Sequence, residues 1–223
     1  MTNAQVKSRE RVTEHGEVFT NEREVKDMCD LVKQETERID SRFLEPACGN
    51  GNFLAEILQR KLAVVKQRYG KSSADYEKYS FIAVSSLYGV DILEDNAQEC
   101  RERLYHIWFK EYQNILKAGL SNQCCNAVKY VFQKNILCGD ALTLKQIDDS
   151  PIIFAEWSFI TGSKVKRRDY SLAELLEGKA KKSMADLFQD IEDWTYDAES
   201  ESFIPTPIRD YPLVDYWRVQ ENE

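Results

Sequence analysis

The sequence predicts an α/β fold in which short buried strands alternate with amphipathic helices. An apolar run that ends at Glu45 leads into a glycine turn and then into a helical pattern. Two further apolar runs, 87–92 and 135–142, each reach an acidic residue, and helix-sized spacings separate the three runs. Open α/β sheets place ligand groups at the carboxyl ends of their strands, so we expect a ligand site where these runs end.

The glycine turn is the stretch around which the chain is organised. Gly49 and Gly51 can adopt positive φ and bring the backbone close to a ligand. Asn52 is the expected N-cap of the helix that follows. That helix has an apolar face formed by Phe53, Leu54, Ile57, Leu58, Leu62 and Val65.

An acid before the glycines narrows the class of ligand. Glu45 would repel phosphates, and neither a third glycine nor a P-loop Lys-Ser/Thr follows. The turn is therefore a poor dinucleotide or nucleoside-triphosphate site and suits a ligand that carries a cationic amine. An unrelated strand–loop–helix turn is the alternative interpretation.

The other two strand ends and one upstream segment complete the pattern. Asp91 ends the run 87–91 and Asp140 ends the run 136–140, although an acid in such a place also serves as a helix cap. Upstream, Gly16-Glu17-Val18-Phe19-Thr20 precedes a helix that Asn21 can cap. Taken alone, that segment is simply a loop before a helix.

Together, these segments resemble the class I S-adenosylmethionine (SAM)-dependent methyltransferases over roughly residues 14–142. Glu-Pro-Ala-Cys-Gly-Asn-Gly-Asn-Phe resembles in particular the adenine-N6 DNA methyltransferases of restriction-modification systems. The resemblance implies a Rossmann-like sheet, with fewer strands than the usual seven as an alternative, and S-adenosyl-L-methionine as cofactor. It also implies that Phe19 and Thr20 line the methionine end of the pocket, that Asp91 accepts from the ribose hydroxyls, and that Asp140 accepts from the adenine amine. The implied cofactor residues are Phe19, Thr20, Glu45, Ala47, Cys48, Gly49, Gly51, Phe53, Asp91, Ile92, Asp140 and Ala141.

The resemblance breaks at the expected catalytic loop. The family carries Asn/Asp-Pro-Pro followed by an aromatic residue, whereas no two of the five prolines here are adjacent. The corresponding strand, 151–160, contains Glu156-Trp157, an acceptor beside an aromatic. Successive side chains of a strand point to opposite faces, so we expect the two to separate, Glu156 as surface charge and Trp157 in the core. The catalytic residues therefore stay unknown.

Composition predicts a soluble cytoplasmic protein. The 223 residues are 43% hydrophobic and 30% charged, without an apolar run of membrane-spanning length or an apolar signal core. Six scattered cysteines without a Cys-x-x-Cys pair favour reduced thiols over a disulfide framework or a metal site. A net charge of −8 opposes strong binding to DNA by the chain alone.

We expect residues 1–160 to form the methyltransferase-like domain, with a polar N-terminal arm at 1–13. Residues 161–223 should form a basic and helical segment and an aromatic-proline arm without a core of their own. The pattern predicts a linker at 71–75 and helices near 76–86, 96–117, 124–132 and 172–191. The last helix should carry Met184, Leu187 and Ile191 on its apolar face, and Lys179, Lys181 and Lys182 add positive charge to it. Segment 190–201 is acidic. The basic run of Lys164, Lys166, Arg167 and Arg168 is either a solvated face or a DNA contact.

Three functions stay open at this point. The first is a SAM-binding methyltransferase of adenine-N6 DNA type that is truncated or split, with a protein partner supplying the catalytic or target-recognition parts. The second is a noncatalytic regulatory protein or acidic decoy on the same scaffold. The third is a methyltransferase that acts on RNA or a small molecule.

Overall fold

The computed structural model describes residues 7–117, 119–180, 194–197 and 202–222. Three parallel strands form its centre in the order β1 (Phe43–Glu45), β2 (Leu87–Asp91) and β3 (Ile136–Asp140), and β4 (Lys145–Gln146) adds an antiparallel edge. Glu45 lies opposite Gly89, and Asp91 lies opposite Cys138. The carboxyl ends of the three strands therefore meet at one edge of the sheet.

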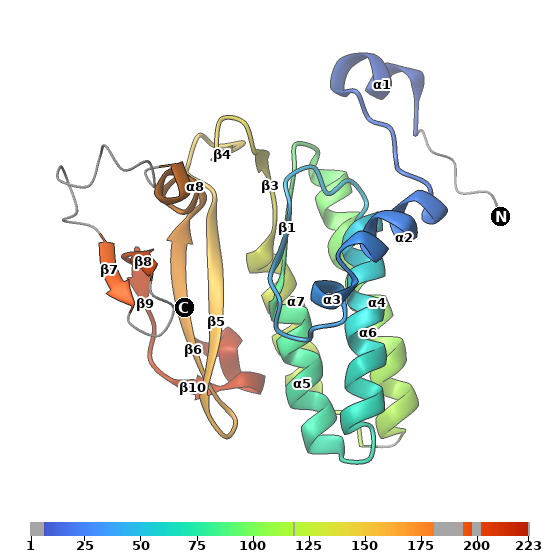
Figure 1. The fold of residues 1–223 in the computed structure, drawn as a ribbon, viewed down its shortest axis with the longest axis vertical. Coiled ribbons are helices and arrows are strands. Elements are labelled where there is room, and N and C mark those ends of the chain that lie inside the picture. Colours follow the sequence, from blue (N-terminus) through green and yellow to red (C-terminus); the bar gives the residue numbers. More distant parts are fainter. Residues whose placement is uncertain (1–6, 118, 181–193, 198–201, 223) are drawn as a thin grey trace.

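Four long helices connect and cover the parallel strands. Between β1 and β2 lie α4 (Asn52–Tyr69) and α5 (Ser73–Ser85), and between β2 and β3 lie α6 (Glu94–Leu116) and α7 (Asn122–Asn135). Their apolar faces share one core, in which Trp108 and Tyr112 of α6 are fully buried. Figure 1 shows the parallel strands between these helices and a second, antiparallel sheet.

The second sheet is built around the hairpin of β5 (Ile153–Thr161) and β6 (Lys164–Ser171). The strands β9 (Arg209–Asp210) and β10 (Val214–Asp215) pair with β6. Alternate residues of β5 contact different neighbours: Ala155 and Trp157 join the core of the helices, whereas Phe154 packs with Tyr88 of β2. The sheet therefore encloses the side of β2 that the helices leave open.

The expected α/β class is confirmed, and the sheet differs from the Rossmann-like expectation in one respect. The strand at 151–160 does not extend the parallel sheet, because it pairs antiparallel with β6 over its whole length. Among the described residues, the parallel part is thus limited to three strands. The Rossmann-like assignment itself stays a prediction.

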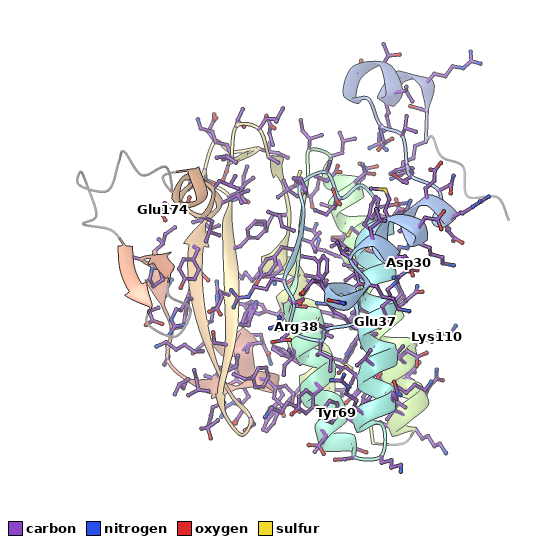
Figure 2. The ribbon with its side chains drawn as sticks, in the orientation of Figure 1. Asp30, Glu37, Arg38, Tyr69, Lys110 and Glu174 are labelled. Atoms are coloured by element: carbon purple, nitrogen blue, oxygen red, sulfur yellow. The ribbon has the colours of Figure 1, made fainter. Side chains whose placement is uncertain are left out.

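Shorter elements lie at both ends of the chain. The N-terminal ones are α1 (Arg9–His15), α2 (Glu22–Leu31) and α3 (Lys33–Thr36), and the later ones are α8 (Leu172–Ala180), β7 (Trp194–Asp197), β8 (Ser202–Pro205) and the 3₁₀ helix η1 (Tyr216–Glu221). Figure 2 shows charged side chains such as Asp30, Lys110 and Glu174 on the outside of this arrangement. No helix in the described ranges combines the length and apolarity that a membrane crossing requires.

Several local expectations are corrected. Asn52 is the first residue of α4 rather than its cap, because Gly51 holds the capping position with φ of 83°. The linker expected at 71–75 is shorter, because α4 ends at Tyr69 and α5 begins at Ser73, where Ser72 caps the helix by accepting from the amide of Asp75. The basic run 164–168 is part of β6. In α2, Val25 and Cys29 are buried, whereas Met28 is about half exposed, at 52%.

The predicted helix at 172–191 is described only up to Ala180. Its expected apolar residues Met184, Leu187 and Ile191, and the basic Lys181 and Lys182, lie outside the described residues, as does most of the acidic segment 190–201. In the C-terminal arm, Tyr211 and Tyr216 are buried against the rest of the chain, at 6% and 3% exposure. The arm gains strand structure because β6 offers it an open edge.

Candidate cofactor-binding site

The glycine turn between β1 and α4 is tightly enclosed. Both glycines adopt left-handed backbone conformations, with φ of 52° at Gly49 and 83° at Gly51. A Cβ at Gly49 would lie 3.0 Å from the ring of Phe19, and one at Gly51 would lie 2.6 Å from Sγ of Cys100. Only glycine satisfies both the conformation and the space. The turn therefore packs against Phe19 on one side and against α6 on the other.

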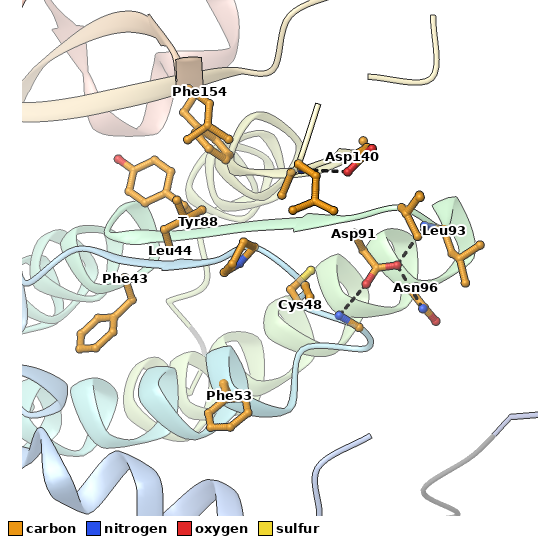
Figure 3. Close-up of a pocket in the computed structure, with 18 of the residues that line it drawn as sticks. Phe43, Leu44, Cys48, Phe53, Tyr88, Asp91, Leu93, Asn96, Asp140 and Phe154 are labelled. Carbon is orange, nitrogen blue, oxygen red and sulfur yellow. Dashed lines mark hydrogen bonds between the residues drawn. The ribbon is translucent and has the colours of Figure 1, made fainter. Parts of the chain in front are cut away.

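Asp91 ends β2 beside this turn. Its carboxylate accepts from the amide of Gly49 at 2.8 Å, from the amide of Leu93 at 2.9 Å and from Nδ2 of Asn96 at 3.2 Å. The residue is only 8% exposed. Figure 3 shows Asp91 between the turn and Asn96. A carboxylate has about four acceptor positions, so capacity remains for a further donor.

Asp140 ends β3 on the neighbouring side. Its Oδ1 accepts from the amide of Leu142 at 2.8 Å and thereby folds the chain sharply after the strand. Ile92 and Leu142 stand near it with exposed apolar side chains, at 52% and 94%. A carboxylate with exposed apolar neighbours at the end of a strand can hold a flat ring that carries an amine.

The N-terminal segment 16–20 lies across the turn. The carbonyl of Thr20 accepts from Nδ2 of Asn52 at 2.8 Å, and Oε1 of Glu17 accepts from Nδ2 of Asn96 at 2.7 Å. Asn96, at 1% exposure, therefore connects Glu17 with Asp91. The segment becomes one wall of the site.

One large cavity joins these parts. Its volume is about 1840 Å³, which exceeds the roughly 300–1,000 Å³ of an ordinary small-molecule site. Ten of the twelve sequence-predicted cofactor residues line it: Phe19, Thr20, Ala47, Cys48, Gly49, Phe53, Asp91, Ile92, Asp140 and Ala141.

Glu45 and Gly51 are the two that do not line the cavity. Burial raises the pKa of Glu45, whose carboxylate accepts only a long bond from the amide of Ala47, at 3.5 Å. Gly51 acts instead through its packing against Cys100. These two residues contribute to the conformation of the turn and not to the lining of the cavity.

The sequence patterns did not point to Glu17 or Asn96. Oε2 of Glu17 is buried without a hydrogen-bond donor, although the guanidinium of Arg11 lies 3.5 Å away. For Glu17 the sequence offered one signal, an acidic residue two positions before Phe19. Asn96 gave no such signal, because it lies on a helix and its role depends on where α6 begins.

The cysteines lie in the core. All six are buried and free, and Cys48 sits beneath the turn. The neighbouring Cys100 thiol and burial both raise the pKa of Cys48, so it stays a neutral thiol. Within the described ranges no three Asp, Glu, His or Cys side chains are grouped to hold a metal ion.

The basic run on β6 is paired within the chain. Lys164 contacts Asp215 at 3.2 Å, Lys166 contacts Asp210 at 2.9 Å, and Arg167 is buried with Asp169 at 2.8 Å. Arg168, whose side chain is 35% exposed, lines the cavity. The DNA contact of these four residues stays a prediction, although Arg167 is only 5% exposed.

Comparison with known proteins adds one finding about sequence and none about structure. No protein-family model matches the chain, and no solved structure matches it. The chain is 26% identical over 130 residues to the DNA methyltransferase A of Bacillus subtilis (strain 168). The match covers 55% of this chain and only 14% of that much longer protein. The chain is thus distantly similar to part of a DNA methyltransferase.

Proposed function

We propose that the chain binds SAM as a methyltransferase-like protein, related to the adenine-N6 DNA type found in restriction-modification systems. One observation carries the proposal. The ends of β1, β2 and β3 bring the glycine turn, Asp91 and Asp140 to one cavity that the segment 16–20 encloses. The similarity to a DNA methyltransferase supports the same assignment.

The donors and acceptors of the cavity fit the cofactor. Asp91 has acceptor capacity for the ribose hydroxyls, and Asp140 offers a carboxylate to the adenine amine. Ile92 and Ala141 supply apolar contacts for the ring. Oε2 of Glu17, buried without a donor, provides a further acceptor on the same side. The acidic site suits a cofactor with a cationic amine and no phosphates.

When bound, SAM supplies an electrophilic methyl group on a sulfonium centre. The contribution of the protein is then to orient the cofactor, to exclude water and to hold the acceptor in line with that methyl group. Phe19 and the turn at Gly49 enclose the site on one side. No general base is assigned to the chain.

Completion by a second protein is part of the proposal. The chain lacks the Pro-Pro loop, and its match corresponds to a small part of a much longer methyltransferase. A partner chain would supply the missing catalytic or target-recognition parts. A noncatalytic regulatory or decoy protein is the second candidate, favoured by the net charge of −8.

Calorimetric titration with SAM tests the proposal. We expect saturable binding that weakens at least about tenfold in Asp140→Asn, because one acceptor is lost. Asp91→Asn should act in the same direction, and circular dichroism checks that each variant is folded. The matched control is Asp27→Asn, an exposed acid of α2. Absence of binding at millimolar SAM by folded wild-type protein would refute the proposal.

A methyl-transfer assay then separates the candidates. Transfer to adenine in duplex DNA, detected as N6-methyladenine by mass spectrometry, indicates an enzyme. SAM binding without transfer favours the partner-dependent enzyme or the regulatory protein, and transfer to RNA or a small molecule favours the third hypothesis.

A further inference from the structure

A second acidic group lines the cavity away from the cofactor residues. Glu156 lies in the middle of β5 and is 9% exposed, whereas its neighbour Trp157 points into the core and donates to Oδ1 of Asn135 at 3.3 Å. The expected separation of the two side chains is confirmed. The expectation that Glu156 is a surface charge is wrong, because the residue is buried and lines the cavity.

The carboxylate of Glu156 is only partly satisfied. Nη2 of Arg42 donates to Oε1 at 2.5 Å, and the hydroxyl of Ser158 donates to the same oxygen. Oε2 is buried without a hydrogen bond, and Nη1 of Arg168 lies 3.8 Å from it. A buried acceptor left without a donor is energetically unfavourable.

This orphan oxygen has a counterpart in the same cavity. Within the described ranges, two carboxylate oxygens are buried without a hydrogen bond, Oε2 of Glu17 and Oε2 of Glu156. Both residues line the cavity. Glu17 belongs to the cofactor side through Asn96, and Glu156 faces a different set of neighbours. The cavity volume, larger than one ordinary ligand needs, agrees with two ligand positions.

The neighbours of Glu156 define the chemistry of the second position. Arg42 and Arg168 place donors on both sides of one acceptor, and Tyr88, Phe154 and Leu172 supply apolar walls. The rings of Tyr88 and Phe154, both labelled in Figure 3, pack edge to face with their centroids 5.3 Å apart. An anion would be repelled by the buried carboxylate, and a cation would be repelled by the two guanidiniums. A flat neutral ring with a donor beside an acceptor fits both the carboxylate and the guanidiniums.

We propose that Arg42, Glu156 and Arg168 form a binding site for a planar nitrogen heterocycle whose exocyclic amine stands next to a ring nitrogen. The amine donates to Oε2 of Glu156, and a guanidinium donates to the ring nitrogen. This proposal rests on the proposed function, because the bound heterocycle would be the methyl acceptor. The three residues of the site are not part of the cofactor site.

Nucleosides of opposite donor pattern test the site. Deoxyadenosine and deoxycytidine have an amine beside a ring acceptor, whereas deoxyinosine and thymidine have an oxygen beside a ring N–H. We expect the first pair to bind wild-type protein at least about tenfold more tightly than the second, since a mismatched pair leaves buried groups unpaired. Titration with saturating S-adenosylhomocysteine, followed by calorimetry, provides the measurement. Equal affinity for all four nucleosides, or no binding, overturns the proposal.

Glu156→Gln is the diagnostic variant. Its amide can present either a donor or an acceptor, so the preference for deoxyadenosine over deoxyinosine should fall to near unity while the affinity for S-adenosylhomocysteine is unchanged. The exposed Glu37→Gln is the matched control and should keep the preference. Arg168→Met, which removes the second donor, gives the same comparison if Glu156→Gln does not fold.

Asp91→Asn separates this site from the proposed function. If it loses S-adenosylhomocysteine but keeps the nucleoside preference, the two sites are distinct, as proposed. If it abolishes nucleoside binding while Glu156→Gln does not, the nucleosides occupy the cofactor side and the proposal is overturned. Wild-type protein that prefers deoxyadenosine but does not bind SAM would refute the proposed function and retain the site.

Discussion

Lys61 lies in the middle of α4 with no exposed surface. Its ammonium donates to the carbonyl of Ser41 and, at 2.5 Å, to the hydroxyl of Ser86. Burial lowers the pKa of Lys61 to about 7. This residue ties the start of β1 to the start of β2, and the surrounding protein penalises its charge.

The stability of the protein should therefore rise with pH above neutrality. Between the folded pKa of about 7 and the ordinary value of 10.5, the unfolded chain holds more protons at this site, so the free energy of unfolding increases with pH. The slope is at most about 1.4 kcal/mol per pH unit for one proton. Urea unfolding from pH 6 to 8.5 should show a smaller slope in Lys61→Met than in wild type. Lys66→Met, at an exposed position of the same helix, should leave the slope unchanged.

Gly51 allows a second test at the level of one residue. Gly51→Ala should destabilise the protein by about 2–4 kcal/mol, because it adds a clash with Cys100 to the cost of a left-handed alanine. Gly162→Ala has the same kind of backbone but open space around it, and it should cost only about 1–2 kcal/mol. Thermal unfolding gives both values. If Cys100→Ala does not reduce the cost of Gly51→Ala, the clash is not its cause.

Among the elements, the N-terminal helix α1 is attached through charged side chains. Arg11 donates to both oxygens of Asp95, at 2.9 and 2.5 Å, and Lys7 contacts Glu99 at 2.6 Å. The hydrogen bond from Arg11 lowers the pKa of Asp95 to about 2. Because Arg11 also approaches Glu17, α1 holds the segment that forms a wall of the cofactor site.

Loss of this attachment should affect the site more than the overall stability. Arg11→Ala should change the free energy of unfolding by less than about 1 kcal/mol, since the pair is near the surface. It should nevertheless weaken SAM binding and speed proteolysis within residues 8–20. Arg23→Ala, which removes an exposed pair on α2, is the control. At high salt the SAM affinity of the wild-type protein should approach that of Arg11→Ala. A difference in affinity that does not depend on salt would argue against an ionic attachment.

At the scale of the whole molecule, a buried polar group joins the antiparallel sheet to the helices. Arg167 of β6 is 5% exposed and donates to Asp169 at 2.8 Å and to the hydroxyl of Tyr130 on α7 at 2.6 Å. Tyr211 of the C-terminal arm donates to the same Asp169 at 2.9 Å. The network thus connects a helix, the hairpin and the arm.

Arg167→Met should destabilise the protein by about 3–5 kcal/mol, because it leaves Asp169 buried without its cation. Arg167→Lys should rescue only part of this loss, since lysine lacks the planar fork that contacts both oxygens. Lys166→Met replaces a neighbouring residue of β6 whose ion pair with Asp210 is partly exposed, and it should cost less than about 1 kcal/mol. Urea unfolding compares the three. Equal costs for Arg167→Met and Lys166→Met would show that the buried network does not join the layers.

The sequence by itself determined the parts of the protein that depend on local pattern. Alternation and helical spacing predicted β1, β2, β3 and the helices between them, because each pattern matches one backbone period. The apolar face of α4 is buried as predicted at Leu54, Leu58 and Leu62. The cofactor side could be assembled from such patterns because parallel strands necessarily place their carboxyl ends at one edge.

Only the tertiary structure decided what the second sheet does. A strand pattern at 151–160 is the same whether the strand joins the parallel sheet or pairs with β6, since periodicity records which faces are buried and not by what. The burial of Glu156 and Arg167 follows from that pairing, and composition alone favours both at the surface. The network of Glu17, Asn96 and Asp91 likewise depends on contacts between segments far apart in the chain, which no local pattern records.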